Sequence, residues 1–202
     1  MLKEYFNAMA PKWDTIMGPE VTEKLKEIVA GCSVRKGAKI LDVACGTGIL
    51  VPILLEAVGE GGEVVGIDFA PEMVRQAQAK NFGSNTRFLV ADVMDLPFDE
   101  GSFDQVFCNG ALPHFPDIPA ALLEMKRVLR GNGGLVICHA SSREKINETH
   151  RRIGEPVAND LLPTAGELKA MLEEAGYMDI VYEDTPDRFV VKARKALNFR
   201  QD

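Results

Sequence analysis

A short apolar run that ends in a glycine loop constrains the fold of this 202-residue chain more than any other feature. Residues 39–44 are mostly apolar and are predicted to form a buried strand, and apolar residues resume at about Ile49 with helical spacing. Between them, Gly46 and Gly48 lack a Cβ atom, which lets the backbone turn sharply and lets a ligand lie against it. The pattern predicts a strand, a ligand-binding loop and a helix that ends at about Val58.

Strands and helices are predicted to alternate through most of the chain. Further apolar runs with the composition of strands occur at 64–68, 86–91, 103–108 and 134–140. Helical spacing occurs at 70–80, 119–129 and 167–175. Alternation of this kind favours a parallel sheet with helices on both faces. The last two strands, 177–183 and 188–195, are expected to be antiparallel, because the four residues DTPD between them are too few for a parallel crossover.

Composition limits the classes of protein to which the chain can belong. Its length suits one α/β domain with a sizeable core, and 1–202 is taken as a single domain. The net charge of −7 argues against a general nucleic-acid binder, which needs a basic face for phosphates. The sequence has neither an apolar stretch long enough to span a membrane nor a signal-peptide core. The four cysteines form no CxxC pair, which indicates free thiols and a cytoplasmic location.

Acidic residues stand at the ends of the two strands that follow the glycine loop. In an open parallel sheet, ligands bind at the carboxyl ends of the strands. Asp68 ends the second strand, where an acid can accept hydrogen bonds from both ribose hydroxyls, and Asp92 follows the third, within reach of an adenine amino group. The pattern indicates a nucleoside site. A dinucleotide fingerprint is absent, because Ala44 and Ile49 occupy two of its three glycine positions, and there is no GxxxxGK[ST] loop.

The motifs resemble, in order and in register over about residues 38–138, those of class I S-adenosylmethionine-dependent methyltransferases. LDVACGTG is similar to the first motif, VVGIDFAPEMV to the second, and FLVADVMDLPFDEGSFDQVFCNGALPHF to the third and fourth. The most similar subgroup comprises the ubiquinone and menaquinone C-methyltransferases and their small-molecule relatives. The resemblance implies a Rossmann-like α/β fold, with a seven-stranded sheet of order 3-2-1-4-5-7-6, strand seven antiparallel, and helices on both faces.

The resemblance also implies a division of the domain and a set of cofactor contacts. Residues 1–36 would form a helical lid, 37–140 the cofactor-binding core, 141–163 a substrate-side insertion, and 164–202 a C-terminal helix and β-hairpin. The expected cofactor is S-adenosyl-L-methionine. The residues expected to contact it are Tyr5, Trp13, Asp42, Ala44, Cys45, Gly46, Gly48, Asp68, Phe69, Met73, Asp92, Val93 and Asn109.

Some of these positions have a particular expected role or a simpler alternative. Asp42 is expected to bind a loop amide or the ammonium group of the cofactor. Met73 suits adenine packing and the core equally well. Ala44 replaces a glycine that is usual in the family, and Ala70 replaces a common helix-capping serine at a loss of ~1 kcal/mol.

The three histidines of the chain are expected to be the catalytic residues. His114, His139 and His150 all map to the same edge of the predicted sheet, and the resemblance places His114 beside the transferred methyl. Histidine, with an ordinary pKa of ~6.5, suits the removal of a proton from an acceptor. A metal-assisted reaction with His139, His150 and Asp160 is kept as an alternative only, because their spacing matches no strong ligand motif and no metal is expected.

A polar helix on the substrate side is predicted at 142–154, between a capping serine and a glycine. Arg143, Asn147 and His150 recur on one face, which is expected to look toward the transferred methyl. Asp160 follows the helix and could orient either His139 or His150, so these helix residues and Asp160 form the predicted substrate set. A solvated connector helix is the alternative.

The expected reaction is methyl transfer to a small-molecule acceptor. It is an in-line displacement, so the protein must hold the acceptor atom ~3–3.5 Å from the methyl and opposite the departing sulfur. The family methylates carbon, nitrogen, oxygen, sulfur and metalloids, so the resemblance leaves the acceptor atom open, as it does the oligomeric state. Two other classes are retained: a non-catalytic cofactor-binding partner subunit, and a nicotinamide dehydrogenase, which the glycine loop disfavours.

Overall fold

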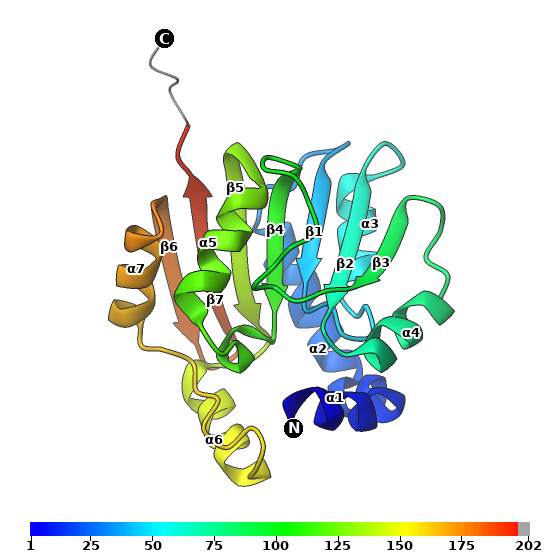
Figure 1. Ribbon diagram of the computed structural model, residues 1–202, viewed down its shortest axis with the longest axis vertical. Coiled ribbons are helices and arrows are strands. Elements are labelled where there is room, and N and C mark those ends of the chain that lie inside the picture. The colour runs from blue at the N-terminus through cyan, green and yellow to red at the C-terminus, as the bar shows by residue number, and fades with distance from the viewer. Residues whose placement is uncertain (198–202) are drawn as a thin grey trace.

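A seven-stranded sheet forms the centre of the computed structural model, which describes residues 1–197 (Figure 1). The strands are β1 (Lys39–Val43), β2 (Glu63–Asp68), β3 (Thr86–Val90), β4 (Phe103–Asn109), β5 (Leu129–His139), β6 (Tyr177–Thr185) and β7 (Arg188–Lys195). Their order is β3-β2-β1-β4-β5-β7-β6, and β7 is antiparallel to both of its neighbours while the other pairs are parallel. The predicted strand order and the antiparallel hairpin are both confirmed.

Helices cover both faces of the sheet. They are α1 (Leu2–Met9), α2 (Trp13–Ala30), α3 (Val51–Val58), α4 (Pro71–Ala79), α5 (Ile118–Val128), α6 (Arg143–Ile153) and α7 (Ala165–Glu174), with the 3-10 turns η1 (Ala10–Lys12) and η2 (Leu112–His114). Alternate residues of each strand face opposite sides. Leu41 and Val43 of β1 therefore belong to the core that includes α5 and α7, and Ile40 belongs to the core that includes α2 and α3.

Most elements begin and end within two residues of the predicted positions. The main difference is β5, which begins at Leu129 rather than at residue 134. Leu129 follows α5 directly with an extended backbone (φ −72°, ψ 139°), so no loop separates the helix from the strand. The run RGNGG at 130–134 has little apolar character, which is why periodicity placed it outside the strand.

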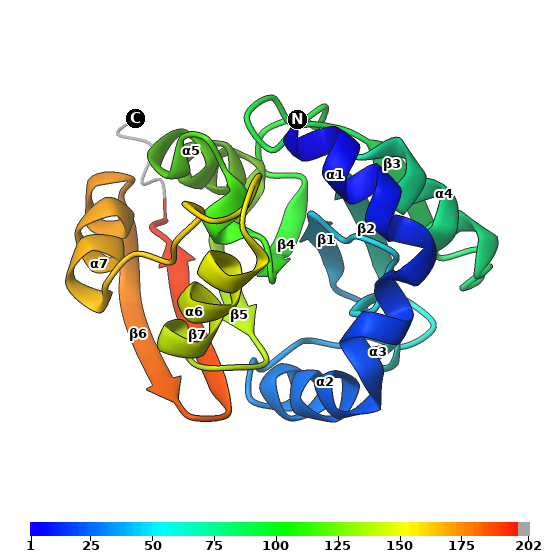
Figure 2. The ribbon, with the colours of Figure 1, turned by 90° about the horizontal axis from the view of Figure 1, so that it is seen from below.

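The N-terminal segment lies across the carboxyl end of the sheet. Seen from below, α1 and α6 cross this end on opposite sides of β1 and β4 (Figure 2). Within α2, Gly18 takes a left-handed conformation (φ 68°, ψ 170°) and Pro19 follows, so the helix is kinked there. The kink separates residues 1–17, which cover the sheet end, from the second half of α2, where Leu25, Ile28 and Val29 pack in the core.

The predicted division of the chain matches this arrangement in outline but stays a prediction. Its last five residues, 198–202, lie outside the described residues. Within the described part of the chain, none of the helices combines the length and the apolar character that a membrane crossing requires.

Candidate active site

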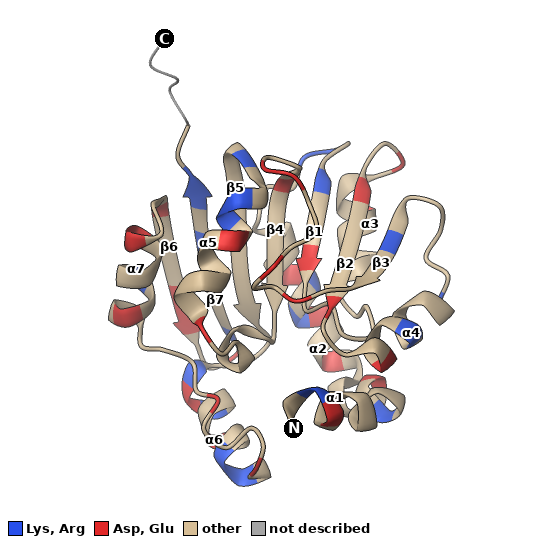
Figure 3. Cartoon of the chain, in the orientation of Figure 1, with Lys and Arg blue, Asp and Glu red and all other residues tan. Residues whose placement is uncertain are grey.

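Two buried carboxyl groups lie at the carboxyl ends of β1 and β2. Acidic residues stand out at these two strand ends in a sheet interior that is otherwise mostly uncharged (Figure 3). Asp42 is 1% exposed, and neither of its carboxyl oxygens has a hydrogen-bond partner among residues 1–197. Burial, reinforced by nearby Asp68, raises the pKa of Asp42 to about 8. A buried polar group without partners is costly, so this carboxyl is suited to a ligand that brings hydrogen-bond donors or positive charge.

Asp68 joins the glycine loop to the start of α4. Its Oδ2 accepts from the Gly46 amide at 2.9 Å, and its Oδ1 accepts from the Ala70 amide at 2.8 Å. Burial raises the pKa of Asp68, and the two amides oppose that rise. Ala70 is the N-cap of α4 and supplies no capping side chain, as expected from the sequence. Asp68 therefore binds the main-chain amide of the N-cap residue itself.

The loop after β1 has the backbone that the glycine pattern predicts. Gly46 has a φ of +55°, and a Cβ atom placed on it would lie 3.7 Å from Nε1 of Trp13 in the lid. Ala44 also lies in the left-handed region, at φ 55°, where a non-glycine residue is strained. The strain at Ala44 gives the physical reason why glycine is usual at this position in the resembled family.

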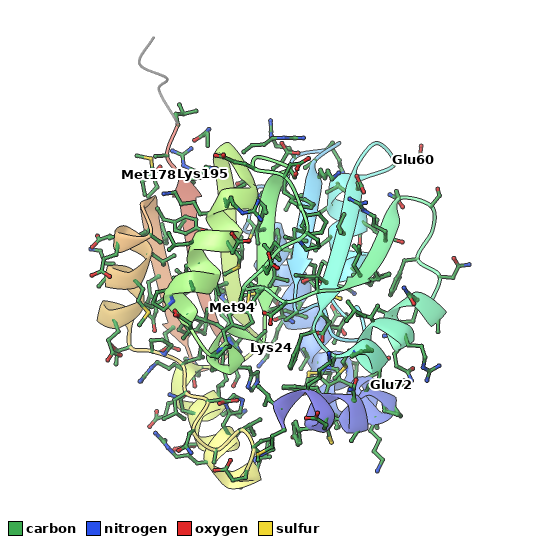
Figure 4. All side chains as sticks on the ribbon, viewed as in Figure 1. Lys24, Glu60, Glu72, Met94, Met178 and Lys195 are labelled. Carbon is green, nitrogen blue, oxygen red and sulfur yellow. The ribbon has the colours of Figure 1, made fainter. Side chains whose placement is uncertain are left out.

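An aromatic cluster closes the loop from the N-terminal side. Phe6, Ala10, Ala70 and Met73 are buried together, with Tyr5, Trp13 and Phe69 packed against them; we call this group the lid cluster. A hydrogen bond also joins α4 to α1, because the main-chain amide of Glu72 donates to Oδ1 of Asn7 at 2.9 Å. Figure 4 labels Glu72 at the place where α4 meets α1. Four of the predicted cofactor residues therefore lie together in one cluster: Tyr5, Trp13, Phe69 and Met73.

The remaining predicted cofactor residues occupy the same edge but differ in exposure. Asp92 is exposed, and its Oδ1 accepts from the Met94 amide at 2.9 Å. Val93 and Cys45 are buried, and burial raises the pKa of the Cys45 thiol. Asn109 ends β4, and its Oδ1 accepts from Sγ of Cys138 at 3.7 Å.

His114, His150 and Asp160 come together beyond the end of β4. Nδ1 of His114 lies 2.7 Å from Oδ2 of Asp160, and Nδ1 of His150 lies 2.5 Å from the main-chain oxygen of the same Asp160. The two imidazole rings are 4.9 Å apart between centroids. Burial lowers the pKa of His114; Asp160 raises it and His150 lowers it further. The contact of Asp160 with His150 agrees with the expectation from the sequence, whereas its contact with His114 was not expected.

His139 shares this edge but differs in environment. It ends β5 and packs edge-on against Phe189 at 5.8 Å between centroids, and its buried Nε2 has no hydrogen-bond partner in the described part of the chain. Burial, with smaller contributions from His114 and His150, lowers the pKa of His139 to about 3. Its imidazole is therefore neutral and weakly basic at neutral pH. A catalytic role for His139 stays a prediction.

The polar face of α6 is used mainly to hold a loop. The helix begins and ends as predicted, with Ser142 as its N-cap and Gly154 at φ 84° as its stop. Nε of Arg143 donates to the main-chain oxygens of residues 162 and 163 at 3.0 and 2.9 Å. The Asn147 side chain donates to the oxygen of Leu162 at 3.3 Å and accepts from its amide at 2.8 Å.

These contacts correct the expectation that Asn147 looks toward the methyl, while a substrate role for Arg143 stays a prediction. The amide of Asn147 is buried and both of its polar atoms are bound to main chain, so it positions the segment that carries Asp160. The metal alternative is also not supported. Residues 1–197 contain no group of three His, Cys, Asp or Glu side chains placed to hold a metal ion.

Two contacts of the lid were not anticipated. Phe6 packs edge-on against His114 at 5.1 Å between centroids, and also against Phe69 and Trp13, so it links the lid cluster to the histidines. Asp14 accepts from Oγ1 of Thr47 in the glycine loop at 2.5 Å. Phe6 and Asp14 lie in the segment predicted as a lid, and Thr47 lies in the glycine loop, so the segments were predicted although these pairings were not.

The fold and the site together define a class of protein. A glycine loop after β1, acids at the ends of β1 and β2, and an antiparallel β7 inserted between β5 and β6 are the features of the Rossmann-like methyltransferase fold. The chain matches the family model described as a methyltransferase domain over residues 34–176. It belongs to this methyltransferase family, and the resemblance inferred from the motifs is confirmed.

Individual relatives agree with the family. The demethylmenaquinone methyltransferase of Staphylococcus aureus is 35% identical over 179 residues, which cover 77% of this chain and 74% of that protein. A chain from the complex between the Haloferax volcanii Trm112 methyltransferase activator and a methyltransferase has a TM-score of 0.79 at 23% identity, covering 95% of this chain and 97% of its own. A SAM-dependent methyltransferase from Aquifex aeolicus has a TM-score of 0.76 at 24% identity, and the match covers 93% of this chain and 97% of that chain. These comparisons support S-adenosyl-L-methionine as the cofactor.

Proposed function

We propose that this protein transfers a methyl group from S-adenosylmethionine to a small-molecule acceptor. The observation that carries the proposal is Asp42, a fully buried carboxyl with two unpartnered oxygens beside the glycine loop. S-adenosylmethionine brings an ammonium group and a sulfonium centre, both positive, and when bound it supplies the methyl group. A positive group near Asp42 would lower the pKa of its carboxyl and make its burial favourable.

The other carboxylate at this edge suits the ribose. A carboxylate has about four acceptor positions, and the amides of Gly46 and Ala70 occupy two of those of Asp68. The remaining positions can accept from the two ribose hydroxyls. Gly46 keeps the loop bare where the ligand would lie, and the lid cluster offers apolar surface for the adenine and excludes water.

The acceptor would bind on the histidine side. The insertion at 141–163 carries His150 and Asp160 to His114, and Phe6 of the lid closes the same place. The role of the chain there is to fix the acceptor atom in line with the methyl, which can supply a large part of the rate enhancement.

All four cysteines are free and buried, in keeping with a cytoplasmic location.

Calorimetry with S-adenosylmethionine and with NAD tests the cofactor assignment. The wild-type protein should bind the first and not the second, and Asp42→Asn should bind S-adenosylmethionine more weakly. Asp99→Asn is the matched control, because Asp99 is an exposed turn residue away from the site. Binding of NAD alone would overturn the proposal. Cofactor binding without methyl transfer to any acceptor would instead indicate the non-catalytic subunit.

A further inference from the structure

Asp160 contacts two histidines, His114 and His150, and in each it contacts the same ring nitrogen, Nδ1. Its carboxylate binds Nδ1 of His114, and its main-chain oxygen binds Nδ1 of His150. The inference drawn from this geometry rests on the proposed methyl transfer and concerns the chemical class of the acceptor.

The partners of the two rings determine where their hydrogens lie. A main-chain oxygen can only accept, so Nδ1 of His150 must carry a hydrogen. A carboxylate also only accepts, so Nδ1 of His114 carries one as well. In the neutral rings, Nε2 is then an unprotonated acceptor on both histidines. No hydrogen bond within residues 1–197 uses either Nε2, so both lone pairs are available to a donor on a ligand.

We infer that the methylated atom of the acceptor carries a proton, and that His114 is the base that removes it. The acceptor is therefore a compound that loses a proton when it is methylated, such as an amine, a phenol or a thiol. Its lone pair forms the bond to the methyl carbon, and the electron pair of the broken methyl–sulfur bond stays on sulfur. The proton passes to Nε2 of His114, and the Asp160 carboxylate stabilises the resulting imidazolium through Nδ1–H.

The surroundings of His114 favour this role over a structural one. Phe6 packs on the ring from the lid and adds no charge, so closing the lid shields the ring from water. The ionisable groups on this side are Asp160, His150 and His139; Asp160 favours protonation of His114 and His150 opposes it. Burial lowers the pKa of His114, so it stays unprotonated and ready to accept at neutral pH.

The tautomers can be measured without any acceptor. Nitrogen-15 NMR of the protein bound to S-adenosylhomocysteine at neutral pH should show His114 and His150 both protonated at Nδ1, with the three histidines assigned from single His→Gln variants. In Asp160→Asn, the amide can donate as well as accept, so the tautomer of His114 should change. His150 is the internal control, because its partner is main chain and it should keep Nδ1–H. A proton on Nε2 of His114 in the wild-type protein overturns the inference.

Kinetics with two matched acceptors test the base itself. For a phenol or a thiol acceptor, one member of the pair is protonated at the assay pH, such as a phenol with a pKa of ~10, and the other has already lost its proton, such as a nitrophenol. His114→Gln should lower kcat about 100-fold or more for the protonated acceptor and less than ~5-fold for the ionised one, since only the first needs a base. Equal losses on both acceptors, or no loss on either, would overturn the inference.

The pH profile and the acceptor range complete the test. For the protonated acceptor, kcat/KM should fall as the pH drops through the pKa of His114, at a midpoint below ~6.5 because burial lowers that pKa. Asp160→Asn should lower kcat while Asp99→Asn leaves it unchanged. Transfer only to aprotic acceptors, such as thioethers or tertiary amines, overturns the inference and leaves the proposed function intact. Absence of any transfer overturns the proposed function and the inference with it.

Discussion

Replacing Asp42 with asparagine tests the cofactor site through the stability of the protein without its cofactor. Burial first, and then the nearby Asp68, raises the pKa of Asp42 from 3.8 to about 8. In the unfolded chain the same carboxyl is ionised above pH 4, so between these two pKa values the folded protein holds a proton that the unfolded chain has lost. The free energy of unfolding therefore falls as the pH rises through this window.

The magnitude follows from the shift. Each pH unit inside the window is worth about 1.4 kcal/mol, so the penalty reaches about 4 kcal/mol at pH 7. Asparagine has nearly the same shape and no such proton to lose. The Asp42→Asn variant should therefore gain stability relative to the wild type, by ~2–3 kcal/mol more at pH 7 than at pH 5.

Urea denaturation at several pH values between 5 and 8, without cofactor, measures this difference. Asp99→Asn should follow the wild type at every pH, because its side chain is exposed. The cost of the buried amide in Asp42→Asn does not vary with pH. The test is therefore how the stability difference between the variant and the wild type changes with pH. A stability difference that stays constant from pH 5 to pH 8 would refute the reasoning that Asp42 is a buried, unpartnered carboxyl.

Three further predictions follow from the same edge of the sheet. Asp68→Ala should weaken S-adenosylmethionine binding by ~2–4 kcal/mol in calorimetry, because it removes a charged acceptor and frees two amides; unchanged affinity would contradict its assignment. Ala44→Gly should stabilise the protein by up to ~1 kcal/mol in denaturation, because relief of the left-handed strain exceeds the added entropy of the unfolded chain, and a loss of stability would count against it. Cofactor should slow hydrogen exchange in residues 5–17, and Asp14→Ala, which removes the contact to Thr47, should speed it. An exchange rate that neither the cofactor nor the substitution changes would argue against a lid.

Much of the fold could be predicted because it depends on local pattern and on loop length. The alternation of strands and helices indicated the parallel part of the sheet, and four residues between the last two strands excluded a parallel crossover there. The boundary of β5 was missed, because Leu129 pairs with Phe103 but an irregular stretch of polar and glycine residues separates it from the next pair, Gly134 with Gln105. Periodicity detects buried side chains, so it does not detect such a segment.

The candidate site was predictable in its residues and less so in its contacts. Positions at strand ends follow from topology, so the gathering of Asp42, Asp68 and the histidines could be expected. Helical spacing also placed Arg143 and Asn147 on a face with His150, but it could not show that the loop at Leu162 occupies that face. Contacts between segments distant in sequence depend on how loops close, which no local pattern records.

Transfer of a labelled methyl group from S-adenosylmethionine into a panel of small amines, phenols, thiols and metalloids tests the central claim most directly. The wild-type protein should label at least one acceptor. Gly46→Val should label none while keeping most of its folded structure by circular dichroism, because a branched side chain at φ +55° crowds the loop that the ligand lies against. Wild-type protein that binds the cofactor but labels nothing, or Gly46→Val that labels as well as the wild type, would contradict the account.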